Sequence, residues 1–171
     1  ALPKIATDRY GYQGYGIEYN PASVEYGKKY FSNIYEGTIT TLLGLTKKLK
    51  RPEIIVMDDV LEHLVYPNRD FDIIQTIQTK GDIIIMRQMD YNSLGRKLFG
   101  KSWFYLQPGA HMFYFEEQSV RRFLAKHGYK VIGVHKINPL KNIVASLLWK
   151  LKIVLTPNKS TRQKPLYLKA R

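Results

Sequence analysis

The chain has 171 residues, with 27 lysines and arginines against 14 aspartates and glutamates, and no cysteine. This length suits one domain with its own hydrophobic core, so a single domain over residues 1–171 is expected. The lack of cysteine excludes disulfides and thiolate metal sites and is compatible with the cytoplasm. The formal net charge of +13 favours anionic partners such as nucleic acid, phosphorylated substrates or acidic lipid surfaces.

Neither a secretory signal nor a transmembrane segment is visible in the sequence. The longest apolar segment, residues 143–155, is interrupted by Lys150 and Lys152. It is also shorter than the roughly 20 residues that a transmembrane helix needs. This segment could contact a membrane surface, cover a sheet or form a homodimer, and the sequence does not decide between these three roles. The chain begins without Met, as if within a longer protein.

Short apolar runs alternate with segments of helical length in the first half of the chain. Strands are predicted at residues 15–19, 33–36 and 53–57. A helix over 23–31 separates the first two strands, and a basic helix or loop over 40–51 precedes the third.

The same alternation continues through the second half. Helices are predicted at 68–79, 93–99, 117–127 and 139–155. Strands are predicted at 82–87, 129–135 and 165–169. Strands that alternate with helices indicate an α/β fold, with helices on both faces of a largely parallel sheet.

The segment from Asp59 to His63 directly follows the apolar strand predicted at 53–57. It therefore lies at the carboxyl end of a strand, where open α/β sheets bind ligands. If residues 59–64 form a helical turn, Asp59, Glu62 and His63 share one face, because positions i, i+3 and i+4 are neighbours on a helix. Such groups are costly in a core and useful in a reactive site.

Several segments together carry a resemblance to a known family. They are Gly16-Ile-Glu18-Tyr-Asn-Pro21, Glu36-Gly-Thr38, Asp58-Asp-Val-Leu-Glu-His63 and Pro108-Gly-Ala-His111-Met-Phe-Tyr-Phe115. In this order they resemble the class I S-adenosylmethionine-dependent methyltransferases, and most closely the subgroup that contains the ubiquinone-type O-methyltransferases. The resemblance implies a Rossmann-like sheet of order 3-2-1-4-5-7-6 with strand 7 antiparallel. The family's first strand and glycine-rich loop would precede residue 1, so the first strand is expected to be absent from this chain.

The resemblance also implies residues that bind S-adenosyl-L-methionine. Glu18 matches the acidic residue that binds the ribose hydroxyls, and the whole implied set is Glu18, Tyr19, Gly37, Thr38, Met57 and Asp58. Glu18 could instead be a solvated loop residue, Gly37 a turn residue and Met57 part of the core.

A second set of residues is implied around the methyl acceptor. Asp59, Glu62, His63 and His111 resemble residues that hold a divalent cation in some O-methyltransferases, and their donor atoms suit Mg²⁺, Mn²⁺ or Zn²⁺. Without a metal, His63 or His111 is the candidate general base, because imidazole titrates near neutral pH. Glu62 and His63 could also be structural. The aromatic segment 103–105 either covers the acceptor or packs beneath a long loop.

The predicted function is methyl transfer from S-adenosylmethionine to an oxygen of a small molecule, sugar or lipid precursor. Three alternatives remain open. The chain could be an inactive methyltransferase-like binding module, or an RNA methyltransferase, for which the basic charge is the main support although nucleic acid is not favoured. A nicotinamide oxidoreductase is disfavoured because no Tyr-x-x-x-Lys pair occurs.

Overall fold

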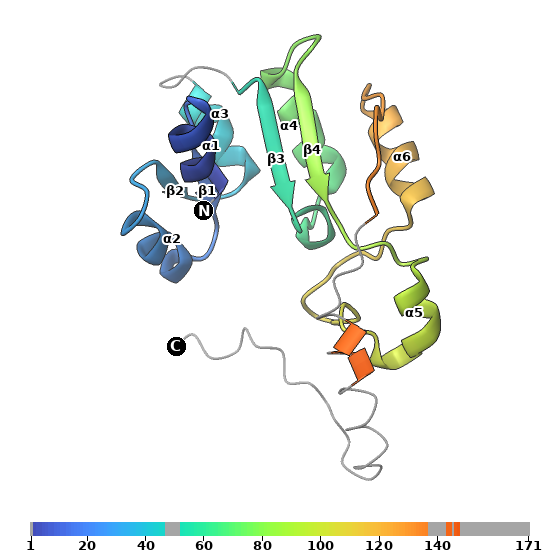
Figure 1. Ribbon diagram of the computed structural model, residues 1–171. Helices are drawn as coiled ribbons and strands as arrows, with labels where there is room; N and C mark the ends of the chain where they lie inside the picture. The colour runs from blue at the N-terminus through green and yellow to red at the C-terminus, as the bar shows by residue number, and fades with distance from the viewer. Residues whose placement is uncertain (1, 47–51, 137–142, 145, 148–171) are drawn as a thin grey trace. The chain divides into compact units, whose positions relative to one another are not determined.

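The structure is a computed structural model that describes residues 2–46, 52–136, 143, 144, 146 and 147. Helices alternate with short strands in this part of the chain, so the predicted α/β class is confirmed (Figure 1). Two compact units are present, one made of Ala1–Ile55 and Asn68–Ile83 and the other of Val56–Pro67 and Ile84–Arg171. We describe each unit by itself.

The elements follow one another in the chain as α1 (Leu2–Tyr10), β1 (Gly16–Glu18), α2 (Pro21–Lys28), β2 (Ile34–Glu36), α3 (Ile39–Thr46), β3 (Ile54–Asp58), the 3₁₀ helix η1 (Leu61–His63), α4 (Pro67–Ile77), β4 (Ile83–Arg87), α5 (Leu94–Phe99), the 3₁₀ helix η2 (Gly100–Ser102) and α6 (Glu117–Lys126).

The first unit contains a β–α–β arrangement. Strands β1 and β2 are parallel, with Glu18 opposite Glu36, and α2 connects them. The connection is a helix because two parallel strands cannot be joined by a tight turn. Val24 of α2 and Ile34 of β2 are both buried and form the core of this arrangement. The carboxyl ends of the two strands therefore lie at the same edge.

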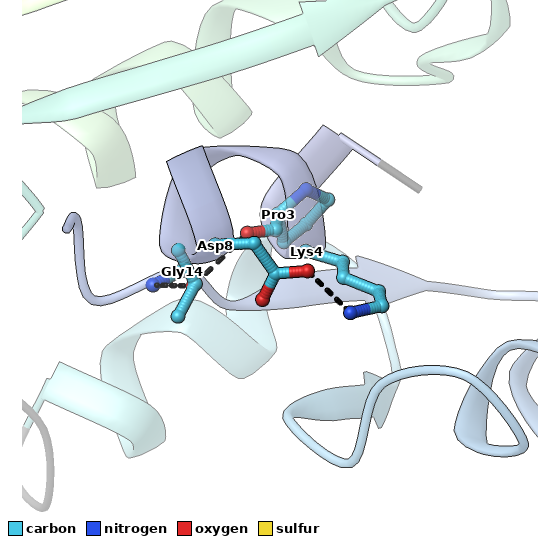
Figure 2. A network of polar contacts seen from close by, with 5 residues as sticks. Pro3, Lys4, Asp8 and Gly14 are labelled. Carbon is cyan, nitrogen blue, oxygen red and sulfur yellow. Dashed lines mark hydrogen bonds and ion pairs between the residues drawn. The ribbon is translucent and has the colours of Figure 1, made fainter. Parts of the chain in front are cut away.

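A polar network joins α1 to the loop that leads into β1 (Figure 2). The Thr7 hydroxyl donates to the Pro3 carbonyl oxygen over 3.0 Å and accepts from the Gly14 backbone nitrogen over 3.2 Å. A Cβ at Gly14 would lie 2.5 Å from the Pro3 oxygen, so this approach requires glycine. Lys4 and Asp8 add an ion pair across one turn of the helix. The bond between Thr7 and Gly14 thus ties the loop before β1 to α1.

Strands β3 and β4 form a second two-stranded sheet. The Ile83 nitrogen donates to the Glu53 oxygen over 2.9 Å at the start of the strands, and the Asp59 nitrogen donates to the Arg87 oxygen over 3.0 Å at their end. The strands are therefore parallel, as Figure 1 also shows. Their carboxyl ends bring Asp59 beside Arg87.

Helix α4 is amphipathic. Phe71 and Ile74 are completely buried and Ile77 is nearly so, at a spacing of three residues. This spacing keeps the three side chains close to one face of the helix. The helix predicted at 68–79 is confirmed, with the first residue at Pro67 and the last at Ile77.

The second unit continues from β4 into a short helix and an aromatic loop. Ser93 caps α5, and its hydroxyl accepts from the Arg96 backbone nitrogen over 3.2 Å. Gly100, at a φ of 54°, ends that helix. Trp103 follows and is buried, with its ring centroid 6.2 Å from that of Tyr91. Trp103 therefore packs against Tyr91, and the proposed cover over an acceptor stays a prediction.

One predicted strand is wrong. Residues 129–136 have no regular secondary structure, and the Ile132 side chain is 84% exposed. The alternating apolar pattern suits a strand, but no strand in the described part of the chain pairs with this segment, and a strand needs such a ladder.

The other predicted strands agree with β1 to β4 to within one or two residues. The sheet order 3-2-1-4-5-7-6 stays a prediction, since the described residues form two separate pairs. Of the final helix predicted at 139–155, only residues 143, 144, 146 and 147 are described, and these are helical. The strand predicted at 165–169 lies outside the described residues.

Candidate active site

The carboxyl ends of β1 and β2 hold the residues predicted to bind the adenosine. Glu18 ends β1, and its Oε1 accepts from the Asn20 backbone nitrogen over 2.8 Å. The Gly37 nitrogen donates to the Glu18 carbonyl oxygen over 3.0 Å. Glu18 and Gly37 are thus brought together, and Tyr19 lies between Glu18 and the helix cap with most of its surface exposed. A carboxylate in this place can accept hydrogen bonds from two neighbouring hydroxyls.

Gly37 and Thr38 form a tight turn that leads into α3. Gly37 has a φ of 151°, and a Cβ there would lie 1.9 Å from Oγ1 of Thr41. The same Oγ1 accepts from the Thr38 backbone nitrogen over 3.0 Å. Only glycine therefore fits at residue 37.

The carboxyl end of β3 carries Met57, Asp58 and Asp59. Met57 is buried, whereas Asp58 is exposed. Arg87, the last residue of β4, forms ion pairs with both carboxylates, through Nε to Asp58 and through Nη2 to Asp59, the latter over 2.9 Å. In the structure, both predicted carboxylates therefore share one guanidinium group, which balances one of their two negative charges.

The predicted helical turn begins later than expected. Asp59 has a φ of 52°, in the left-handed region, and the 3₁₀ helix η1 starts only at Leu61. The prediction that Asp59 shares a helical face with Glu62 and His63 is therefore wrong, because the backbone changes direction at Asp59. Its carboxylate bonds to Arg87 instead.

Glu62, His63 and His111 form one group at η1. Each offers a carboxylate oxygen or a ring nitrogen, and these three atoms all lie within 4.8 Å of one another. The two imidazole rings have centroids 4.9 Å apart and an interplanar angle of 61°. The structure thus brings together three of the four residues predicted as metal ligands and both predicted bases.

The loop before His111 is bound to η1 through its backbone. The Met112 nitrogen donates to the Glu62 carbonyl oxygen over 2.8 Å. In the other direction, Nδ1 of His63 lies 2.7 Å from the Ala110 carbonyl oxygen. These two bonds hold His111 beside Glu62 and His63, although 47 residues separate His63 from Ala110.

Both histidines have the same tautomer. Nδ1 of His63 faces the Ala110 carbonyl, and Nδ1 of His111 lies 3.0 Å from the carbonyl oxygen of Tyr105. A carbonyl oxygen only accepts hydrogen bonds, so each neutral ring carries its proton on Nδ1 and keeps a lone pair on Nε2. That lone pair can accept a proton or bind a metal ion.

Burial shifts the pKa values of two residues in this group, Glu62 and His111. Glu62 is 1% exposed, and its Oε2 has no hydrogen-bond partner in the described part of the chain. Burial raises the pKa of the Glu62 carboxyl above its usual value, and the negative charges of Asp59 and Asp58 raise it further. Burial also lowers the pKa of His111, and the charge of His63 acts in the same direction. Burial therefore favours the neutral form of His111.

Two contributions to this site had not been predicted. The backbone carbonyls of Tyr105 and Ala110 determine the histidine tautomers. Every residue has such a carbonyl, so a sequence pattern does not indicate which ones will face a histidine. Arg87 was also missed, although it is a charged residue that ends an apolar strand. The expected alignment of parallel strand ends could have placed it beside Asp58 and Asp59.

Comparison with known proteins identifies one family. A family model described as "Methyltransferase domain" matches residues 2–134. No curated protein and no solved structure gives a significant match to the chain. Within the described residues, none of the helices has the length and apolar character needed to cross a membrane.

Proposed function

The chain belongs to the methyltransferase domain family, and we propose that it transfers a methyl group from S-adenosylmethionine to an oxygen atom of its acceptor. The family generally uses this methyl donor. The observation that carries the proposal is the group of Glu62, His63 and His111, because oxygen methylation requires removal of a hydroxyl proton and this group contains two imidazole rings that can accept one.

The residues after β1 and β2 are proposed to bind the nucleoside part of the donor. Oε1 of Glu18 already accepts one hydrogen bond from Asn20, which orients the carboxylate. Oε2 is then available for a ribose hydroxyl. Tyr19 offers an exposed aromatic ring, and the backbone of Gly37 and Thr38 can border a flat base. Met57 and Asp58 are proposed to border the methionine part.

The chemistry expected from the chain itself is orientation and proton removal. When bound, S-adenosylmethionine supplies a methyl group on a positively charged sulfur, which needs no further activation. Nε2 of His111 or His63 would take the proton of the acceptor hydroxyl as the oxygen bonds to the methyl carbon and the sulfur–methyl bond breaks, with S-adenosylhomocysteine as the leaving group. The lowered pKa of His111 favours the unprotonated form of this nitrogen. Alignment of the two reactants supplies most of the acceleration.

A divalent cation at the same group is a second proposal. Glu62, His63 and His111 supply one oxygen and two nitrogens, a donor set that suits Zn²⁺ or Mn²⁺ better than Mg²⁺. The unpartnered Oε2 of the buried Glu62 supports this assignment, because an ion would compensate an otherwise costly carboxylate. Such an ion would lower the pKa of an acceptor hydroxyl. Asp59 is left out of the ligand set because Arg87 engages its carboxylate.

The acceptor is proposed to be a small molecule, a sugar or a lipid precursor. Methylation of RNA is the alternative that the net charge of +13 favours. An inactive binding module would bind the donor without transferring its methyl group. The family match runs through both compact units, which supports one methyltransferase domain over this part of the chain, for which the cytoplasm is the proposed compartment.

The deciding experiment is calorimetric titration with S-adenosylhomocysteine. We expect Glu18→Ala to weaken binding by roughly 10- to 100-fold, since a hydrogen bond to a charged group contributes about 1.5–3 kcal/mol. Glu25→Ala is the matched control, because Glu25 is an exposed carboxylate on α2. Equal affinity of Glu18→Ala and the unaltered protein would refute the proposed adenosine site.

The cation proposal has its own test. Titration of the metal-free protein with Zn²⁺ or Mn²⁺ should show one saturable site, which is lost in Glu62→Gln and in His111→Ala. Saturable metal binding that is unchanged in both variants would place the ion elsewhere. If no ion binds while S-adenosylhomocysteine still does, the histidines act as bases alone.

A further inference from the structure

Arg87 makes three connections to the end of β3. Its carbonyl oxygen accepts from the Asp59 nitrogen over 3.0 Å, its Nη2 donates to the Asp59 carboxylate over 2.9 Å, and its Nε pairs with Asp58. Asp59 is thus bound to the same residue through its backbone and its side chain. One arginine therefore determines the position of the whole Asp59 residue.

Asp59 needs such support because its backbone is in an unfavourable conformation. Its φ of 52° is the one positive value among the non-glycine residues that the structure describes. The left-handed region costs a residue other than glycine roughly 1–2 kcal/mol, and somewhat less for aspartate and asparagine. A conformation of this kind persists only where surrounding contacts hold it.

The turn at Asp59 sets the direction of η1. Val60 is the single residue between Asp59 and the 3₁₀ helix that carries Glu62 and His63. Relaxation of Asp59 to a negative φ would change the direction in which the chain enters η1. Nδ1 of His63 would then leave the Ala110 carbonyl, to which it now lies within 2.7 Å.

We propose that Arg87 is a positioning residue, which acts through Asp59 to keep Glu62 and His63 aligned with His111. The hydrogen bonds and ion pairs of the Arg87 side chain go to Asp58 and Asp59 and to none of these three side chains. This inference rests on the proposed function only for its effect on catalysis, because the alignment itself can be measured without any substrate. An isolated ion pair on a surface contributes almost nothing to the free energy of folding. The charge of Arg87 alone therefore does not explain why it contacts both the backbone and the side chain of Asp59.

The primary test is the hydrogen bond of His63, observed by ¹H–¹⁵N NMR of the imidazole nitrogens. In the metal-free protein both histidines should show a protonated Nδ1. Arg87→Met should remove this signature from His63, whereas the global melting temperature changes little. Arg69→Met is the matched control, since Arg69 is equally exposed, at 62% against 64%, and its ion pair with Asp70 involves neither Asp58 nor Asp59. An unchanged His63 tautomer in Arg87→Met would overturn the proposal.

A second substitution tests whether the effect passes through Asp59. Glycine adopts a φ near 50° without strain, so Asp59→Gly should restore the His63 signature in the Arg87→Met background. Asp59→Val, which disfavours this conformation, should resemble Arg87→Met even with Arg87 present. If Asp59→Gly does not restore the His63 signature, Arg87 does not act through the backbone conformation of Asp59. Should Arg87→Met not fold, Arg87→Lys replaces it, because lysine keeps the charge but cannot form the two-pronged contact.

Activity provides an independent measurement. Arg87→Met should lower kcat by about 10- to 100-fold, the cost of misplacing a reactive group, while the affinity for S-adenosylhomocysteine stays the same. If the protein transfers no methyl group at all, the NMR result still decides the role of Arg87. The failure of the proposed function and the failure of this inference are therefore distinguishable.

Discussion

Glu62 is the residue whose placement is hardest to explain by folding alone. It is almost fully buried and its Oε2 has no partner in the described part of the chain, which is costly for a carboxylate. Burial raises its pKa more than a backbone hydrogen bond and His63 lower it, so the surroundings compensate the charge only in part. A core position that only needed to be filled would be better occupied by leucine or methionine. Uncompensated acids of this kind cluster at functional sites.

Gly37→Ala is expected to destabilise the protein and to weaken donor binding. Its Cβ would meet Oγ1 of Thr41 at 1.9 Å, and its φ of 151° is open only to glycine. We expect a loss of about 1–3 kcal/mol in the free energy of unfolding, which denaturant titration measures. The control is Gly44→Ala in α3, where no atom lies within 4 Å and the helix should gain up to about 1 kcal/mol. Equal stability of the two variants would contradict this account.

The site could be predicted from the sequence only in part. The prediction of Glu62, His63 and His111 as one group was possible because their segments resemble a known family and because strand ends gather at one edge of a sheet. The position of Asp59 was not predictable, since a helical spacing says nothing about a left-handed residue that breaks the helix. Arg87 acts from another strand, and its partner depends on sheet pairing rather than on local spacing.

At the scale of elements, the apolar runs at 53–57 and 82–87 predicted β3 and β4 because β-branched residues favour a strand. The burial expected for such runs is not observed, since Val56 and Ile85 are about half exposed in the described part of the chain. The failure at 129–135 has another cause. Strand formation there depends on a partner elsewhere in the chain, which a local pattern cannot supply. Similarly, η1 is short because two features bound it, the turn at Asp59 and the extended backbone of Leu64.

The start of α6 offers a test of its stability against pH. Glu117 pairs with Lys136 over 3.1 Å and with Arg121 over 2.9 Å, and hydrogen bonds from these two residues lower its pKa. A lowered pKa in the folded state gives stability that is present above the usual glutamate pKa and is lost as the pH falls through the lowered value. Glu117→Gln should therefore have a slightly lower Tm at pH 7.

The difference in Tm between Glu117→Gln and the unaltered protein should vanish in acid and shrink with added salt. Thermal unfolding followed by circular dichroism across this pH range measures it. Glu116→Gln is the matched control, because Glu116 is exposed and its side chain makes no capping hydrogen bond. A difference that persists in acid would show that the substitution acts through packing and not through charge.

At the scale of the whole molecule, the positive charge is unevenly distributed along the chain. Residues 137–171 contain eight lysines and arginines and no acidic residue, which leaves an excess of +5 for the first 136 residues. The family match ends at residue 134, before this basic segment. The charge that favours a polyanionic partner is thus mostly separate in sequence from the residues proposed for methyl transfer.

This separation predicts that RNA binding and donor binding can be altered independently. Replacement of Lys159, Arg162, Lys164, Lys169 and Arg171 by alanine should weaken binding to single-stranded RNA. It should also reduce the slope of log affinity against log salt, by about 0.7 for each lost phosphate contact. Filter binding at several salt concentrations measures both quantities, and the affinity for S-adenosylhomocysteine should not change. The matched control replaces five exposed lysines of the first 136 residues, namely Lys28, Lys29, Lys80, Lys97 and Lys101. An equal loss of RNA affinity in the control would mean that the attraction comes from the net charge of the molecule and not from its last 35 residues.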